Sequence, residues 1–125
     1  MQLPTKGAVV ATEDLKPICE HFGLHDLWRD IEADPPSKPF KSDGCSPWPD
    51  TWFGGKDLYT GCFVHDIFYW AGKPGDELGR LKADAWLMLW VAENVSVELG
   101  EKMFAGVRVG GAEWLPTPWR WGFGR

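Results

Sequence analysis

The chain has 125 residues and a formal net charge of −5. A nucleic-acid-binding protein needs a clustered basic surface, and this acidic balance does not suggest one. No apolar run approaches the roughly 20 residues of a membrane-spanning helix. Residues 1–10 lack the apolar core of a secretory signal, so we expect none. The length fits one domain over residues 1–125.

Residues 12–32 carry apolar side chains at helical spacings, and Gly23 marks the break between two short helices. Cys19, His21 and His25 have no fourth ligand nearby, so a zinc site is not expected there. Residues 33–55 are rich in Pro and Gly and therefore predict a long loop. Because this loop also carries aromatic residues, we expect it to be ordered and functional.

A His-Asp pair lies in the apolar segment 62–69, which predicts a helix. Burying His65 and Asp66 among apolar neighbours is costly unless both are partnered. Tyr69 follows His65 by one helical turn and lies on the same face. The preceding pair, His25-Asp26, has no such neighbours, and we expect it to be a surface cap.

A long helix is expected from about residue 76 to about residue 97. Two faces of it are candidates for the buried one. The first contains a carboxylate (Leu81, Asp84, Met88, Val91, Val95), and the second leaves that carboxylate at its edge (Leu78, Leu81, Ala85, Leu89, Ala92). We favour the first, because a buried Asp84 could pair with a helical His.

The last part of the chain predicts a third, shorter helix bracketed by Gly100 and Gly106. The segment 110–125 is irregular and aromatic. It could wrap the core or lie on a membrane interface, where Trp and Arg are favoured. We favour the wrapping.

The loop and the first long helix together offer oxygen ligands. If Cys45 and Cys62 bond, the Asp43 carboxylate and the Gly44 carbonyl come near Asp66. Such ligands suit calcium rather than zinc. A calcium ion beside a His, with a second carboxylate to orient that His, is typical of a hydrolase that activates water.

The segments Ser42-Asp43-Gly44-Cys45, Pro49-Asp50 and Cys62-x-x-His65-Asp66-x-x-Tyr69 together resemble the secreted phospholipase A2 superfamily, above all its prokaryotic and phage-associated members. The resemblance covers residues 42–86. It implies a mainly α domain with two antiparallel core helices, a calcium-binding loop and an irregular aromatic tail. It also implies roles for individual residues: His65 as general base, Asp84 as its orienting partner, Tyr69 as the support of that Asp, calcium held by Asp43, Gly44 and Asp66, and a Cys45–Cys62 disulfide.

The chain also departs from that family. Phe63 stands where many members have a second Cys, and Ser46-Pro47-Trp48 replaces the glycine-rich calcium loop of the animal enzymes. The third calcium ligand of the loop therefore stays open.

The resemblance implies calcium-dependent hydrolysis of phospholipid acyl esters, with a phospholipid membrane surface as partner. Exposed aromatic residues would meet that surface (Trp48, Trp52, Phe53, Trp119, Trp121). Two alternatives remain: an idle calcium-stabilised module that binds lipid or protein, and a structural component of a phage particle. The complete set of His65, Asp66, Tyr69 and Asp84 favours the enzyme. Without a signal segment, release with a phage or by a non-classical route is the expectation.

Overall fold

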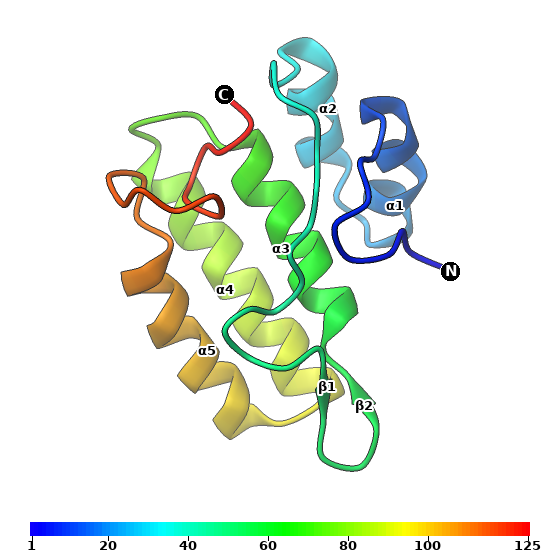
Figure 1. Ribbon diagram of the computed structural model, residues 1–125, viewed down its shortest axis with the longest axis vertical. Coiled ribbons are helices and arrows are strands. Elements are labelled where there is room, and N and C mark those ends of the chain that lie inside the picture. Colours follow the sequence, from blue (N-terminus) through cyan, green and yellow to red (C-terminus); the bar gives the residue numbers. More distant parts are fainter.

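The computed structural model describes residues 1–125, and it is mainly helical. Five α-helices are preceded by a short 3-10 helix, η1 (Thr12–Asp14), and a two-stranded sheet lies before the third α-helix. Figure 1 shows α3, α4 and α5 side by side with alternating directions, and α1 and α2 on the other side of α3. The helix bounds are α1 Leu15–His21, α2 His25–Ala33, α3 Tyr59–Ala71, α4 Glu77–Asn94 and α5 Val97–Gly110.

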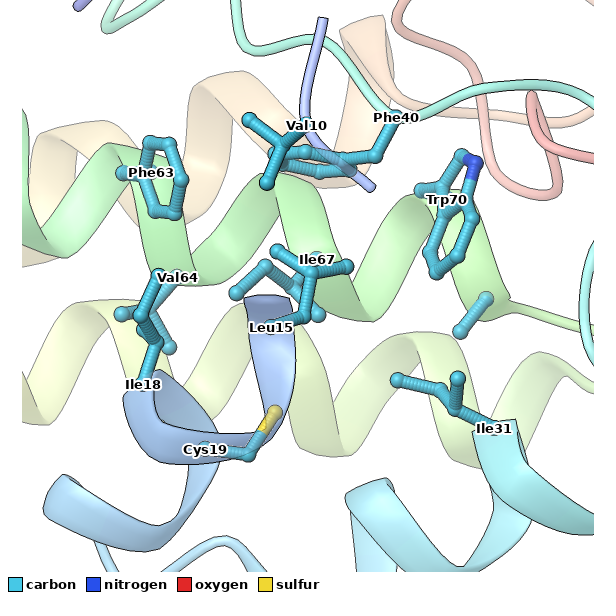
Figure 2. Close-up of a cluster of buried hydrophobic side chains, with 11 residues drawn as sticks. Val10, Leu15, Ile18, Cys19, Ile31, Phe40, Phe63, Val64, Ile67 and Trp70 are labelled. Atoms are coloured by element: carbon cyan, nitrogen blue, oxygen red, sulfur yellow. The ribbon is translucent and has the colours of Figure 1, made fainter. Parts of the chain in front are cut away.

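Helix α3 is the centre of the molecule, since ten of its 13 residues are buried. On one side it meets α1, α2 and the N-terminal arm (residues 1–11), and Figure 2 shows Val64 and Ile67 directed toward α1. On the other side it meets α4 and α5 through Cys62. A helix buried on both sides is apolar all round, as the segment 62–69 is in the sequence.

The predicted break at Gly23 is confirmed. Helix α1 ends at His21, α2 begins at His25, and Gly23 has a φ of 69°. The loop after α2 is ordered through contacts with the N-terminal arm. The Val10 N–H donates to the Phe40 carbonyl at 3.0 Å, and the Gly7 N–H donates to the Ser42 carbonyl at 2.8 Å.

A small hairpin was not predicted. Strand β1 (Thr51–Trp52) pairs antiparallel with β2 (Lys56–Asp57). Two-residue strands are too short to show alternation. The three-residue connection Phe53-Gly54-Gly55 contains a hairpin signal, since both glycines have positive φ.

The predicted inward position of Asp84 on α4 is confirmed, because its exposed fraction is 0%. The alternative face is wrong, since Leu78 and Leu89 are exposed. Leu81, which was expected on both candidate faces, is also exposed. The buried face of α4 instead contains Arg80, Ala83, Asp84, Leu87 and Val91.

The prediction of a short helix bracketed by Gly100 and Gly106 is wrong. Both glycines lie inside α5, which has 14 residues. These two glycines are required for close packing against neighbouring segments, and neither of them ends the helix. A Cβ at Gly100 would lie 2.6 Å from the Met88 carbonyl oxygen, and a Cβ at Gly106 would lie 2.2 Å from the Trp48 ring. Helix α5 therefore tolerates two poor helix formers so that α4 and the loop can approach closely.

The irregular C-terminal segment lies on the core, as favoured. Trp121 is buried, and its ring packs edge-on against Tyr69 with centroids 5.1 Å apart. The Gly122 N–H donates to the Tyr69 carbonyl at 2.7 Å, so the segment is tied to the end of α3. Trp121 is consequently not available to a membrane interface, and that part of the expectation is wrong. Of the other aromatic residues expected at the surface, Phe53 and Trp119 are exposed, and Trp48 and Trp52 are half-buried.

None of the helices combines the length and the apolar character needed to cross a bilayer.

A disulfide joins Cys45 to Cys62, which the resemblance implied, and Cys19 is free. The bond ties the loop to the first turn of α3 across a sequence separation of 17 residues. Burial raises the pKa of the Cys19 thiol to about 11, so this thiol is a weak nucleophile at neutral pH.

The disulfide is expected to contribute measurable stability. A Cys45→Ser/Cys62→Ser variant should lose about 3 kcal/mol of unfolding free energy, because a cross-link of this span restricts the unfolded chain. Urea denaturation with and without a reductant measures the loss. The reductant should lower the stability of the wild type and leave the variant unchanged; a wild type insensitive to reductant contradicts the prediction.

Candidate active site

His65 and Asp84 are brought together from α3 and α4. The His65 Nε2 lies 2.8 Å from Asp84 Oδ1, and both side chains are buried. An ionised carboxylate can only accept a hydrogen bond, so Nε2 carries the proton. The other ring nitrogen, Nδ1, is then unprotonated in the neutral imidazole and can accept a proton.

Tyr69 supports the same carboxylate. Its hydroxyl donates to Asp84 Oδ1 at 2.7 Å, and its ring stands 4.5 Å from the His65 ring. Burial and the negative charge of Asp84 raise the pKa of Tyr69, so the phenol stays protonated and remains a donor. The sequence pattern placed His65, Tyr69 and Asp84 as neighbours, and the structure brings them together.

Two arginines complete the surroundings of Asp84, and the sequence analysis missed both. Arg108 of α5 donates to Asp84 Oδ2 at 2.8 Å. Arg80 is buried, and its guanidinium lies 3.7 Å from the same oxygen. Arg80 also donates to the Tyr69 hydroxyl and to the carbonyls of Val107 and Arg108. One signal was present: Arg80 lies one helical turn before Asp84, where an ion pair is possible.

The loop is shaped by Gly44 and Asp50. Gly44 has a φ of 70°, and a Cβ there would lie 2.4 Å from Asp50 Oδ1. That oxygen instead accepts a hydrogen bond from the Cys45 N–H at 2.9 Å. The Asp50 carbonyl accepts from the N–H groups of Leu58 and Tyr59. Asp50 therefore joins the loop to the start of α3, which is a positioning role that the sequence analysis did not assign.

Asp66 is a buried carboxylate with little compensation. The Ser42 hydroxyl donates to Asp66 Oδ2 at 2.6 Å and accepts from the Gly44 N–H at 3.1 Å. The pKa of Asp66 is raised well above its ordinary value, mainly by burial and to a smaller extent by the negative charge of Asp43. Burial likewise raises the pKa of Asp43, although Lys6 opposes this shift. The pair thus has a marked deficit of positive charge.

The donor set suits a hard cation. The raised pKa values of two neighbouring carboxylates show that their ionised forms are destabilised. A divalent cation that binds both carboxylates removes this destabilisation. The Gly44 carbonyl belongs to the same loop and can add a third oxygen, as calcium prefers. No three side chains of His, Cys, Asp or Glu form a metal-binding group. A cation here would therefore depend on backbone oxygen and water as well as on the two carboxylates.

The site residues open onto one pocket of about 70 Å³. Its polar side contains Asp43, Gly44, His65, Asp66 and Tyr69, while Asp84 lies behind His65 and does not line it. Its apolar side is made by α4 and α5 (Leu87, Met103, Val107) together with Trp48 and Trp119. A proton acceptor, two carboxylates and an apolar wall thus face one another.

Comparisons of the chain with protein-family models, with curated proteins and with solved structures found no match.

The two arginines should differ in their effect on stability. Arg80→Met should lower the unfolding free energy by about 3 kcal/mol, because it removes a buried cationic partner of Asp84 and leaves the Arg108 carbonyl without its donor. The partly exposed Arg108 is the control: Arg108→Gln should cost about 1 kcal/mol. Urea denaturation of both variants measures the difference. Equal losses, or a larger loss for Arg108→Gln, contradict the arrangement.

Proposed function

We propose that the protein is a calcium-dependent hydrolase of phospholipid acyl esters that resembles the secreted phospholipases A2. The single observation that carries this proposal is the buried His65–Asp84–Tyr69 group, whose histidine lines the same pocket as the Asp43 and Asp66 carboxylates. The apolar wall of the pocket supports an acyl substrate. The cysteine pairing and the motif at residues 42–69 support the same assignment.

The proposed reaction follows from the protonation states. His65 Nδ1 takes a proton from a water molecule, and the water oxygen attacks the ester carbonyl carbon. The tetrahedral intermediate then breaks the carbon–oxygen bond to the glycerol. The imidazolium returns its proton to the departing alkoxide, which leaves a fatty acid and a lysophospholipid.

The other residues act on these steps from their positions. Asp84 keeps the proton of neutral His65 on Nε2 and stabilises the imidazolium, while remaining ionised itself. Tyr69 and Arg108 hold the Asp84 carboxylate in place. Asp43, Asp66 and the Gly44 carbonyl would hold the calcium ion. When bound, calcium polarises the ester carbonyl and stabilises the negative charge that forms on its oxygen.

The alternative is a calcium-stabilised binding module without catalysis. One observation favours it: the pocket of about 70 Å³ is smaller than the roughly 300–1,000 Å³ of typical small-molecule sites. A folded, calcium-loaded wild type that binds phospholipid vesicles but releases no fatty acid would support this alternative.

Calcium binding is the first test. Calorimetric titration should detect binding in the wild type and none in Asp66→Asn, since that variant loses the buried anionic ligand. Asp57→Asn, on the exposed strand β2, is the control and should bind as the wild type does. In the presence of a chelator, Asp66→Asn should be at least as stable as the wild type, because it removes a buried uncompensated charge. Unchanged calcium affinity in Asp66→Asn excludes the assigned site.

The catalytic group is the second test. His65→Gln should reduce fatty-acid release from phospholipid vesicles by at least about 10³-fold while calcium affinity is retained. Asp84→Asn should also reduce turnover, because the amide can hold the imidazole in the wrong tautomer. The two losses should not add in the double variant, since either change disables the same unit. His25→Gln is the control and should retain full activity. Calcium-dependent lipolysis that survives in His65→Gln would place the chemistry elsewhere.

A further inference from the structure

A second, larger groove adjoins the pocket. It has a volume of about 510 Å³ and is built by the N-terminal arm, the loop after α2 and the C-terminal segment. Asp43 and Trp119 line both cavities, so the groove and the pocket meet at these two residues. A molecule whose reacting bond lies beside His65 can therefore extend into the groove.

The groove is positively charged, although the protein as a whole is acidic. Three of its lining residues are lysines, Lys6, Lys38 and Lys41, and Asp43 is its single acidic residue. Lys6 has an ion-pair partner, Asp50, at 3.8 Å. Lys38 and Lys41 are exposed, and neither has a carboxylate within ion-pairing distance.

The backbone that carries these lysines is fixed. The Lys38 N–H donates to the Gly124 carbonyl at 2.9 Å, and the Lys38 carbonyl accepts from the Trp70 indole at 2.9 Å. The pairing of Val10 with Phe40 and of Gly7 with Ser42 places the N-terminal arm along the same loop. Lys6 and Lys41 therefore approach the groove from two segments that are hydrogen-bonded to each other.

We infer that the Lys6–Lys38–Lys41 groove receives the anionic head group of the substrate, so that the enzyme selects phospholipids whose head group carries net negative charge. This inference rests on the proposed function. Two unpaired ammonium groups beside the pocket attract a phosphodiester and repel a choline head group, which carries a positive charge of its own. When a cation neutralises Asp43, the field of the groove becomes more positive still.

The test uses two short-chain lipids that disperse as monomers, dibutyroyl phosphatidylglycerol and dibutyroyl phosphatidylcholine. Because neither forms a surface, a difference between them reports the head-group site and not the attraction of the protein to a charged membrane. The wild type should prefer the glycerol lipid by about tenfold in kcat/KM. Lys38→Gln/Lys41→Gln should lose most of this preference through a higher KM for the glycerol lipid. The matched control, Lys16→Gln/Lys82→Gln, removes the same charge elsewhere and should retain the preference.

Three outcomes would overturn the inference. The first is equal hydrolysis of both lipids by the wild type, and the second is an equal loss of preference in the control variant. The third concerns glycerophosphoglycerol, which has the head group but no acyl chains. If its inhibition constant equals the dissociation constant of the glycerol lipid, the ligand of the groove is a soluble phosphodiester and not a lipid.

Binding without turnover separates this inference from the proposed function. Calorimetry on His65→Gln with calcium measures the affinity for each lipid directly. If the wild type hydrolyses neither lipid, but His65→Gln binds the glycerol lipid through Lys38 and Lys41, the hydrolase fails and the head-group site stands. If the wild type hydrolyses both lipids alike, the hydrolase stands and the head-group site fails.

Discussion

The interaction on which the rest of the structure depends is the burial of the Asp84 carboxylate between three helices. His65 and Tyr69 reach it from α3, and Arg108 reaches it from α5. A carboxylate with no exposed surface would be strongly destabilising on its own, so these contacts fix the helices relative to one another. The contacts that stabilise the buried carboxylate use only one nitrogen of His65. The other nitrogen is free, and His65 lines the pocket. The stability of the helical core and the state of the proposed base therefore have one origin.

The two sides of the pocket differ in their charge balance. Asp84 has two guanidinium groups within ion-pairing distance, so its negative charge is fully compensated inside the protein. Asp66 has a hydroxyl donor and a neighbouring carboxylate, and its pKa is raised. The first carboxylate is thus suited to orienting a partner, whereas the second is suited to accepting a cation from outside. This contrast is a physical reason to assign the two aspartates different roles, independent of any family likeness.

Sequence reasoning predicted the elements whose signal is local. The break at Gly23 and the inward Asp84 follow from conformational preference and from helical spacing. Sequence reasoning failed where the role of a residue depends on a contact with a residue far away in the sequence. The glycines of α5 looked like helix ends because the close approach of Trp48 and of the Met88 carbonyl cannot be seen in the sequence. Arg108 was missed for the same reason, since its partner lies 24 positions away on another helix. Trp121 was expected at the surface because nothing local shows that Tyr69 covers it.

Gly44 has a consequence for how this scaffold can diverge. Its positive φ and the nearby Asp50 carboxylate exclude any side chain, so the position admits one residue type for two independent reasons. A diverging copy of the chain could replace His65 and keep its loop, because no hydrogen bond joins the imidazole to the loop backbone. The same copy could not replace Gly44 without rebuilding the loop. Among descendants of this sequence, Gly44 would therefore report whether the loop conformation is kept, and His65 would report whether the proposed catalytic role is kept.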